Sequence, residues 1–197
     1  MNNTMVLTGH DDAYRRIAAV SVPTHAAYAA RRGYSQTVRR GGFAPFRAAT
    51  WSKLLFIRHA LDASGLVLWL DADAAVTGDA DLAELAPAGG AVVTVAADRN
   101  GVNAGVMLWR RCPAAVELID RLWRMEDCVG HHWEDNAALH RAHAASPERF
   151  RVVDKRRFNS YLDDWQPGDF VLHAAGGSPT FKRGAIEHAL MRAAEVP

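Results

Sequence analysis

The chain has 197 residues, of which 49% are hydrophobic and 23% are charged, as in an ordinary globular protein. This length is sufficient for one buried core, and we expect a single domain over residues 1–197. The 23 Lys and Arg residues balance 22 Asp and Glu residues, so the formal net charge is +1. Such a balance gives no argument for a nucleic-acid or anionic-membrane partner, and we expect no nucleic acid to bind.

The chain has few features of exported or membrane proteins. No apolar run approaches the roughly 20 residues that cross a bilayer. Residues 1–12 lack the basic and apolar regions of a signal peptide. Cys112 and Cys128 are too few for a disulfide framework and lack metal-type spacing, which favours free thiols in a reducing compartment. We therefore expect no transmembrane segment and a cytoplasmic location, with peripheral attachment to the inner membrane face as an alternative.

Hydrophobic periodicity in the first part of the chain indicates alternating strands and helices. Thr24 is a candidate helix cap, and Gly33 is a typical helix end. The predicted elements are a strand over residues 5–9, a helix over 24–33, an amphipathic helix over 46–65 and a strand over 66–70.

The same alternation continues to the end of the chain. The predicted elements are strands over 91–97 and 105–110, a helix over 112–125, a helix from about Trp133, strands over 149–154 and 169–176, and a basic helix from about Gly184. This pattern predicts an α/β fold, an α/β/α sandwich with a mainly parallel central sheet. In that architecture ligands bind beyond the carboxyl ends of the strands.

Two carboxylates follow directly on the apolar strand in the segment LVLWLDADAAV, residues 66–76. Strand side chains alternate, so Asp71 and Asp73 are expected to project to the same side. Two close carboxylates repel, and burying either without a partner is costly. A divalent cation resolves both problems, and Mg²⁺ or Mn²⁺ prefers such oxygen ligands and also binds phosphates. A solvated acidic turn is the alternative for this short motif alone.

Several further motifs, taken together in their order along the chain, point to a known family. They are AYAARRGYS (27–35), WSKLLFIRHAL (51–61), WLDADAAV (69–76), NAGVMLWR (103–110), WEDNAAL (133–139), FNSY (158–161) and GDFVLHAAGG (168–177). With them the chain resembles the GT-A-fold glycosyltransferases, in particular the galactosyl/mannosyl/xylosyltransferase family, and is more distantly similar to the glycogenin-like retaining galactosyltransferases. The resemblance implies the GT-A fold, a nucleotide-diphosphate sugar donor and a Mn²⁺ or Mg²⁺ ion.

The resemblance extends to the groups that would hold metal and phosphate. It implies that His173 joins Asp71 and Asp73 as a metal ligand near the donor phosphates. Gly176 would let the backbone approach the diphosphate, and Lys182 would reach a phosphate as a point charge. The alternatives are a hydrogen-bonded structural histidine and a solvated lysine at a helix start.

Three more residues are catalytic candidates by resemblance. In similar enzymes, the residue matching Asn103 hydrogen-bonds the donor sugar, and the one matching Asp135 contacts sugar hydroxyls at the reaction centre. Family members usually carry glutamine directly after that aspartate, whereas this chain has Asn136, one methylene shorter. A turn role for Asn103 and a helix-capping role for Asp135 are the alternatives.

The first strand and the second predicted helix supply the expected nucleotide contacts. Thr8 and Gly9 end the strand where relatives hold the base and ribose, and Tyr14 is expected to stack on the base. The basic residue matching Lys53 approaches the donor phosphates in the family. An exposed helix lysine is the alternative.

Together these features predict a metal-dependent glycosyltransferase. It would move a hexose or pentose from a UDP-sugar such as UDP-galactose, or from GDP-mannose, to a hydroxyl of a glycan, lipid-linked or small-molecule acceptor, with retention. One alternative is a haloacid-dehalogenase-type phosphatase, because LDADAAV also resembles its D-x-D-x-x-V signature. The other is a nucleotide-sugar-binding module without turnover.

Overall fold

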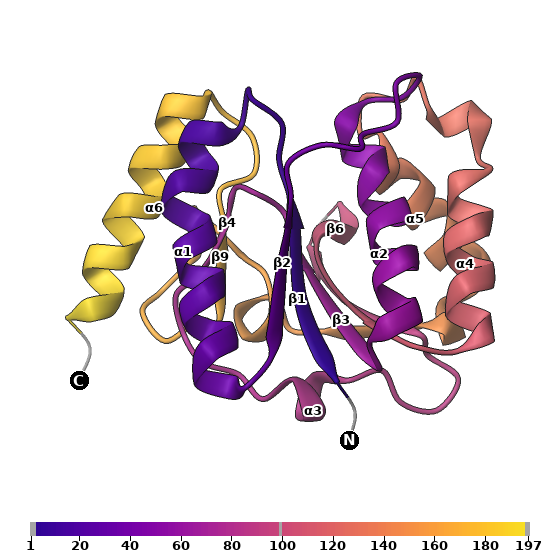
Figure 1. Cartoon of the computed structure of the whole chain (residues 1–197), viewed down its shortest axis with the longest axis horizontal. Coiled ribbons are helices and arrows are strands. Elements are labelled where there is room, and N and C mark those ends of the chain that lie inside the picture. Colours follow the sequence, from indigo (N-terminus) through magenta and orange to yellow (C-terminus); the bar gives the residue numbers. More distant parts are fainter. Residues whose placement is uncertain (1–2, 99, 196–197) are drawn as a thin grey trace.

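A mixed sheet lies at the centre of the fold in this computed structural model, which describes residues 3–98 and 100–195 (Figure 1). Within those residues the sheet has six strands in the order β2-β1-β3-β6-β5-β7. They are β1 (Thr4–Gly9), β2 (Ser35–Arg39), β3 (Leu66–Leu70), β5 (Val93–Asp98), β6 (Gly101–Arg110) and β7 (Phe150–Val153). All neighbouring pairs are parallel except those that involve β6, which confirms the predicted mainly parallel sheet.

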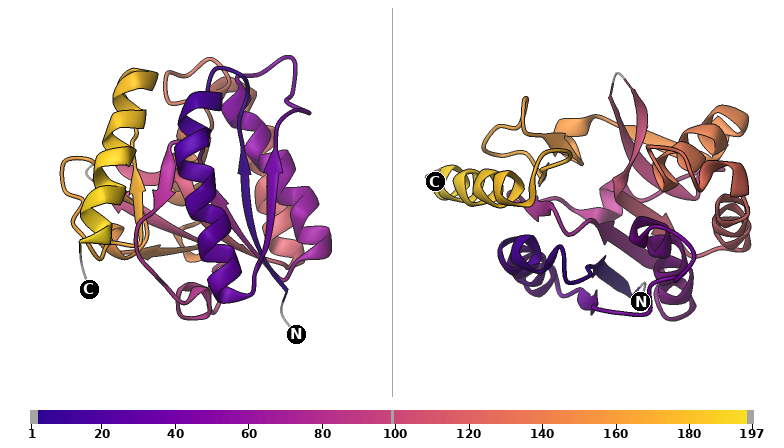
Figure 2. Two further views of the ribbon diagram at one scale, coloured as in Figure 1. Left: turned by 60° about the vertical axis from the view of Figure 1, so that its left-hand side comes forward. Right: turned by 90° about the horizontal axis from the view of Figure 1, so that it is seen from above.

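Helices cover both faces of this sheet (Figures 1 and 2). One face carries α1 (Arg15–Arg32), with α6 (Pro179–Ala194) packed beside that helix, and the other carries α2 (Ser52–Ala63), α4 (Pro113–Trp123) and α5 (Asp135–Ala145). The short α3 (Leu82–Leu85) follows β4. The predicted α/β/α sandwich is therefore confirmed.

The apolar run of β3 is long because both of its faces are buried. Val67 and Trp69 pack with the α2, α4 and α5 side, and Leu66, Leu68 and Leu70 pack with the α1 side. A central strand between two helical layers has no polar face, which explains the unbroken apolar sequence.

A smaller sheet extends the α1 side and brings the C-terminal part of the chain to the end of β3. Among the described residues it consists of β4 (Ala74–Val76), β9 (Val171–His173) and β8 (Ser160–Tyr161), in the order β4-β9-β8. β4 and β9 are antiparallel, with Ala74 paired to His173. This register places His173 beside the turn that carries the two aspartates.

The antiparallel direction of β6 also matters for the site. Leu70, the last residue of β3, pairs with Val106, so residues 101–105 of β6 extend beyond β3. The Asp71 amide donates to the Gly105 carbonyl at 2.8 Å. The start of β6 and the end of β3 therefore meet at one edge of the sheet.

Helix α1 differs most from the sequence-based expectation. It begins at Arg15, not Thr24, and Pro23 lies inside it. Thr24 is not a cap: its hydroxyl donates to the Ser21 carbonyl at 2.6 Å and accepts from the Val76 amide at 2.9 Å. Gly33 ends the helix in the left-handed conformation, φ 67°, as predicted.

Other boundaries shift for local reasons. The expected helix over 46–65 is a 3₁₀ turn at Ala49–Trp51 followed by α2, and α6 begins at Pro179 because Ser178 caps it by accepting from the Phe181 amide. The remaining predicted elements are present within a few residues of their expected bounds. Among the described residues, no helix combines the length and apolar character that a membrane crossing requires.

Candidate functional site

Two aspartates and a histidine converge at the carboxyl end of β3. One ligand atom from each of Asp71, Asp73 and His173 lies within 4.8 Å of the others. The aspartates do not alternate along a strand, because β3 ends at Leu70 and they belong to the turn that leads into β4. The Ala74 amide closes this turn by donating to the Asp71 carbonyl at 3.0 Å. The turn, rather than strand geometry, aims both carboxylates at one point.

The position of His173 depends on a glycine in β6. A Cβ at position 105 would lie 2.1 Å from Cε1 of His173, so only glycine leaves room for the ring. Nε2 of His173 is 3.4 Å from Oδ1 of Asp73. Nδ1 of His173 is buried and finds no hydrogen-bond partner among the described residues. Two carboxylates and an imidazole with a buried, unpartnered nitrogen fit a divalent cation such as Mn²⁺ or Mg²⁺.

Lys53 occupies one side of this cluster and is only 4% exposed, so it is not a surface lysine. Its Nζ lies 2.9 Å from Oδ1 of Asp71 and 3.1 Å from Oδ2 of Asp135. Burial lowers the pKa of Lys53, but the charges of Asp135 and Asp71 outweigh it and raise the pKa above its usual value. Lys53 is therefore a fixed positive charge that links the two carboxylates.

Lys182 pairs with Asp73 as Lys53 pairs with Asp71. Its Nζ lies 2.5 Å from Oδ2 of Asp73 and 3.2 Å from the Tyr14 hydroxyl. Burial raises the pKa of Asp73, but His173 and Lys182 outweigh burial and hold that pKa well below its usual range. The Asp73 side chain is therefore ionised, as a metal ligand must be.

Asp135 begins α5 and is buried in the same site. Burial raises its pKa to about 6, the positive charge of Lys53 acts against this rise, and Asp71 adds to it. A carboxyl group with a raised pKa beside a cleft is a typical functional candidate.

The side-chain amides near the start of β6 have defined orientations. Oδ1 of Asn103 accepts from the Gly105 amide at 2.8 Å and from Nδ2 of Asn159 at 2.9 Å, so its NH₂ group points elsewhere. Oδ1 of Asn136 accepts from the Ala104 amide at 2.8 Å and joins α5 to β6. The oxygen of Asn136 is thus already engaged with the protein backbone.

A cavity of about 110 Å³ opens beside the aspartates. Its walls include the aromatic residues Phe43, Phe56 and Trp69 and the polar residue Thr50. Gly9 lets the Phe56 and Trp69 rings pack close to the β1 backbone, because a Cβ at this position would lie 3.3 Å from both rings. Apolar walls that end at a charged cluster suit a ligand with an aromatic base and an anionic part.

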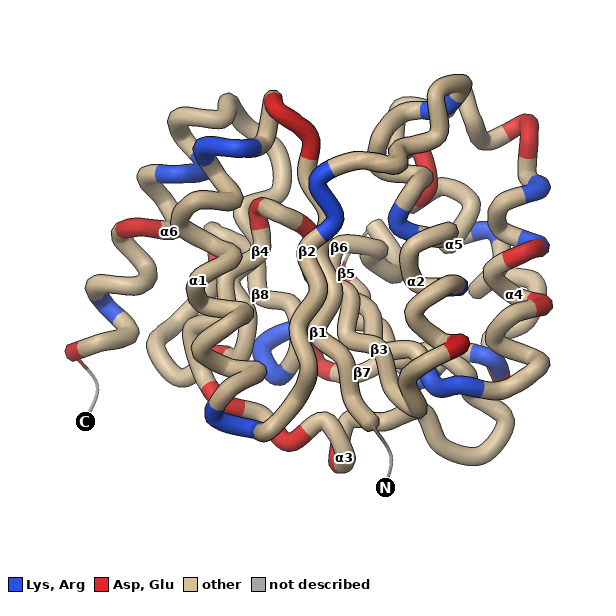
Figure 3. Tube along the Cα trace, viewed as in Figure 1, with Lys and Arg blue, Asp and Glu red and all other residues tan. Residues whose placement is uncertain are grey.

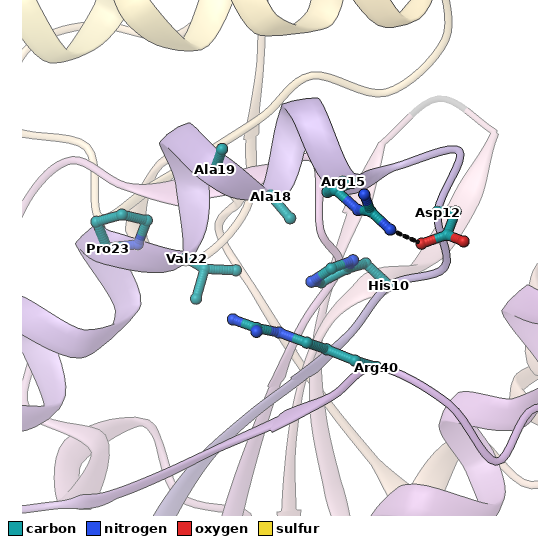
Figure 4. Close-up of a pocket in the computed structure, with 8 residues that line it drawn as sticks. All are labelled: His10, Asp12, Arg15, Ala18, Ala19, Val22, Pro23 and Arg40. Carbon is teal, nitrogen blue, oxygen red and sulfur yellow. Dashed lines mark hydrogen bonds and ion pairs between the residues drawn. The ribbon is translucent and has the colours of Figure 1, made fainter.

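A larger cavity, of about 500 Å³, lies next to the first and shares His10 with it. Figure 4 shows that it lies between α1, which contributes Val22 and Pro23, and the side chain of Arg40. Its carboxylate, Asp12, is paired with Arg15. None of the ionisable residues that line this cavity is buried, whereas most of those around Asp71 are, so we place the chemistry in the smaller cavity.

No family model matches the chain. Its sequence is similar to that of a protein named probable alpha-1,2-galactosyltransferase gmh2 from Schizosaccharomyces pombe, with 28% identity over 95 residues. The matched segment is 43% of this chain and 27% of the yeast protein, so the chain spans about a quarter of that relative.

Solved structures match the chain over nearly its whole length. A glycosyltransferase involved in the glycosylation of the major capsid of PBCV-1 superposes with a TM-score of 0.76 and 15% identity, over 94% of this chain and 99% of that one. The galactosyltransferase LgtC, solved with donor and acceptor sugar analogues, superposes with a TM-score of 0.65 and 15% identity, over 98% and 97%. The fold is GT-A. The predicted resemblance to GT-A galactosyltransferases is thereby confirmed.

Within this GT-A fold the predicted site residues fall into two groups. Most come together: they line the small cavity or lie in the charged cluster and the amides beside it, and they are Gly9, Tyr14, Lys53, Asp71, Asp73, Asn103, Asp135, Asn136, His173 and Lys182. Thr8 is fully buried in β1 and does not line the cavity. Gly176 is exposed in the loop between β9 and α6, with φ 75°.

One residue of the candidate site was missed by sequence reasoning. Asn159 is completely buried, and its Nδ2 donates to Asn103. The motif FNSY carried a signal, since an asparagine directly after a buried phenylalanine needs a hydrogen-bond partner, but the sequence does not say which. The partner lies 56 residues away along the chain.

Proposed function

We propose that this chain is a metal-dependent glycosyltransferase that moves a hexose or pentose from a nucleotide-diphosphate sugar to an acceptor hydroxyl, with retention of configuration. The observation that carries the proposal is the Asp71, Asp73 and His173 cluster at the end of β3 in a GT-A fold. The cluster adjoins a cavity with aromatic walls, which suits a nucleotide.

Different residues of the site would contact the metal, the diphosphate and the sugar. Asp71, Asp73 and His173 would hold a divalent cation, which acts as a Lewis acid toward the diphosphate leaving group. Lys53 and Lys182 bring positive charge to the same end of the site and thus favour a diphosphate there. The NH₂ of Asn103, whose Oδ1 is engaged by the protein, would donate to a sugar hydroxyl, and Asp135 faces the same region through its ion pair with Lys53.

We favour a UDP-sugar, such as UDP-galactose, over GDP-mannose as donor, because the similar yeast protein is named a galactosyltransferase. The acceptor would be a hydroxyl of a glycan, a lipid-linked sugar or a small molecule. A cytoplasmic location stays a prediction.

Nucleotide binding is the first test. We would measure the unfolding temperature with UDP or GDP, each in the presence of Mn²⁺ or EDTA. A ligand at one hundred times its Kd adds about 2.7 kcal/mol to the free energy of unfolding. We expect a Mn²⁺-dependent increase with one nucleotide, lost in Asp73→Asn and His173→Ala. Asp79→Asn is the control, because it removes only a surface ion pair with Arg32.

Turnover separates the proposal from its alternatives. We expect release of UDP or GDP from the matching nucleotide sugar when Mn²⁺ is present. Nucleotide binding without sugar hydrolysis or transfer would favour a binding module. The GT-A fold counts against a haloacid-dehalogenase-type phosphatase. Hydrolysis of p-nitrophenyl phosphate, with no response to either nucleotide, would contradict the transferase.

A further inference from the structure

An exposed aromatic cluster lies directly before α5. The Trp133 side chain is 42% exposed, although tryptophan is usually well buried. Its ring centroid lies 5.0 Å from that of His132, 5.8 Å from that of His131 and 5.2 Å from that of His140. Three imidazoles therefore pack around the indole ring, part of which stays accessible to solvent.

Contacts on two sides place this cluster at the rim of the proposed active site. Thr50 lines the cavity of about 110 Å³ beside the aspartates, which we call the donor cavity. The Thr50 hydroxyl donates to the carboxylate of Glu134, the residue after Trp133. On the other side, Nε2 of His140 lies 2.6 Å from the Val102 carbonyl, one residue before Asn103. The segment from Trp133 to His140 therefore joins the cavity wall to the start of β6, and Trp133 is its first residue.

The backbone conformation of Glu134 explains how its neighbours Trp133 and Asp135 point in opposite directions. Glu134 has φ 50° and ψ −128°, and it is the only non-glycine residue with positive φ in the described part of the chain. Such a conformation costs on the order of 1–3 kcal/mol and is typical of functional sites. Trp133 faces solvent, while Asp135 is buried against Lys53.

We propose that Trp133 is the stacking platform for a sugar ring of the acceptor, which rests on the proposed transferase function. The aliphatic face of a pyranose packs on an aromatic ring, and the neighbouring imidazoles can donate to and accept from its hydroxyls. The arginines that contact the segment just before the cluster are already paired, Arg47 with Glu126 and Arg141 with Asp127. The surroundings therefore suit a neutral polyol better than a phosphate.

The nucleoside of the donor is the competing occupant of this ring. The donor cavity has aromatic walls of its own in Phe43, Phe56 and Trp69, and Trp133 is not among the residues that line it. A base bound in that cavity would have no need of Trp133. The structure thus favours the acceptor.

The test is saturation-transfer NMR with named sugars as probes, in the presence of Mn²⁺ and UDP. The probes are the methyl α-pyranosides of galactose, glucose and mannose, together with lactose and maltose. We expect saturation transfer to at least one of them in the parent protein. Its Kd should rise roughly tenfold in Trp133→Ala, as expected for the loss of one aromatic stack, and less than threefold in Trp133→Phe.

Controls separate this proposal from the transferase function on which it rests. Met191→Ala removes another exposed apolar side chain, on α6, and should leave sugar binding unchanged. The nucleotide-induced increase in unfolding temperature should be the same in the parent protein and in Trp133→Ala. A sugar site that depends on Trp133 in a protein that responds to neither nucleotide would contradict the transferase and leave the platform intact.

Three results would overturn the proposal. The first is no saturation transfer to any of the sugars in the parent protein. The second is an equal Kd in the parent protein and in Trp133→Ala. The third is a loss of the nucleotide response in Trp133→Ala, which would assign the ring to the donor.

Discussion

Gly105 and His173 show how a single missing side chain shapes the site. The imidazole occupies the space where any other residue at position 105 would place its Cβ. The glycine is therefore explained by the close approach of the His173 ring to the backbone of β6 rather than by an unusual φ, since Gly105 is not among the glycines with positive φ.

We expect Gly105→Ala to move His173 away from Asp73 and to abolish Mn²⁺-dependent stabilisation by the nucleotide. Overpacking at such a contact should also lower the free energy of unfolding by about 1–3 kcal/mol. Thermal and urea unfolding with and without ligand would measure both effects. Gly184→Ala is the matched control: its Cβ meets nothing within 4 Å, and alanine in a helix should stabilise by up to about 1 kcal/mol. A normal ligand response in Gly105→Ala would contradict this account.

Asn159 should act through Asn103, whose amide it orients. We expect Asn159→Leu to lower kcat for transfer by about tenfold to a hundredfold with little change in the donor KM, because a misplaced group chiefly costs transition-state stabilisation. Asn103→Ala should show the same defect. The double variant should be no worse than either single one, because the two residues form one unit. Additive losses would mean that Asn159 acts independently.

At the scale of elements, α1 is a polar support for the turn that carries the aspartates. The Ser21 hydroxyl donates to the Ala72 carbonyl at 2.6 Å, and the His25 Nε2 lies 2.7 Å from the Ala74 carbonyl. Both carbonyls flank Asp73. These contacts explain why a buried helix face contains serine, threonine and histidine.

His25 predicts how stability depends on pH. Burial lowers its pKa to about 4, and the hydrogen bond to Ala74 only partly offsets burial. Below about pH 6.5 the unfolded chain binds a proton that the folded protein does not take up until about pH 4, so stability falls as pH falls through this window. Once the pH is below about 4, the free energy of unfolding has fallen by about 3 kcal/mol. Urea unfolding from pH 7 to pH 4 should show a steeper decline in the parent protein than in His25→Gln, and equal slopes would contradict it.

The elements that the sequence predicted best are those with strong apolar patterns. β3 and α4 carry such patterns and were placed within a residue or two. β2 was missed because it is a partly exposed edge strand whose sequence, SQTVR, has little apolar character. The first half of α1 was missed because Val20, Val22 and Pro23 are poor helix formers, and packing against β4 and α6 outweighs that propensity.

The candidate site was predictable where a motif carries it and unpredictable where only tertiary contacts do. Asp71, Asp73 and His173 were expected together on the resemblance, and the structure brings them together. The ion pair between Lys182 and Asp73 joins residues 109 apart in the sequence, and no local pattern reports such a pairing. The reason the aspartates converge was also misjudged, because a turn rather than a strand carries them.

At the scale of the whole molecule, the site joins distant parts of the chain. Charged segments of the β3–β4 turn, α2 and α6 lie in the upper part of the molecule in Figure 3, and the ion pairs of Lys53 with Asp71 and of Lys182 with Asp73 join them. A ligand bound there would contact elements from both ends of the sequence at once.

We therefore expect ligand binding to slow amide hydrogen exchange in two separate regions of the chain at once. Hydrogen exchange, followed by mass spectrometry with Mn²⁺ and the responding nucleotide, should slow in residues 69–76 and in residues 171–183 in parallel. α4 and β7, which contribute nothing to the site, should change little. Protection confined to one of the two regions would mean that the ligand does not bridge the turn and the β9–α6 segment.

The reversed direction of β6 places the connection between β5 and β6 at the same edge of the sheet as Asp71. Asp98 and Gly101 pair at its base, and the Asp98 carboxylate raises the pKa of Tyr161, after burial the largest influence on that phenol. The Tyr161 ring in turn lies 5.8 Å from that of His173. Hairpin connections accept inserted residues at small cost in loop entropy. Residues inserted between β5 and β6 would therefore add side chains beside the candidate site, with every strand register and every candidate metal ligand left as it is.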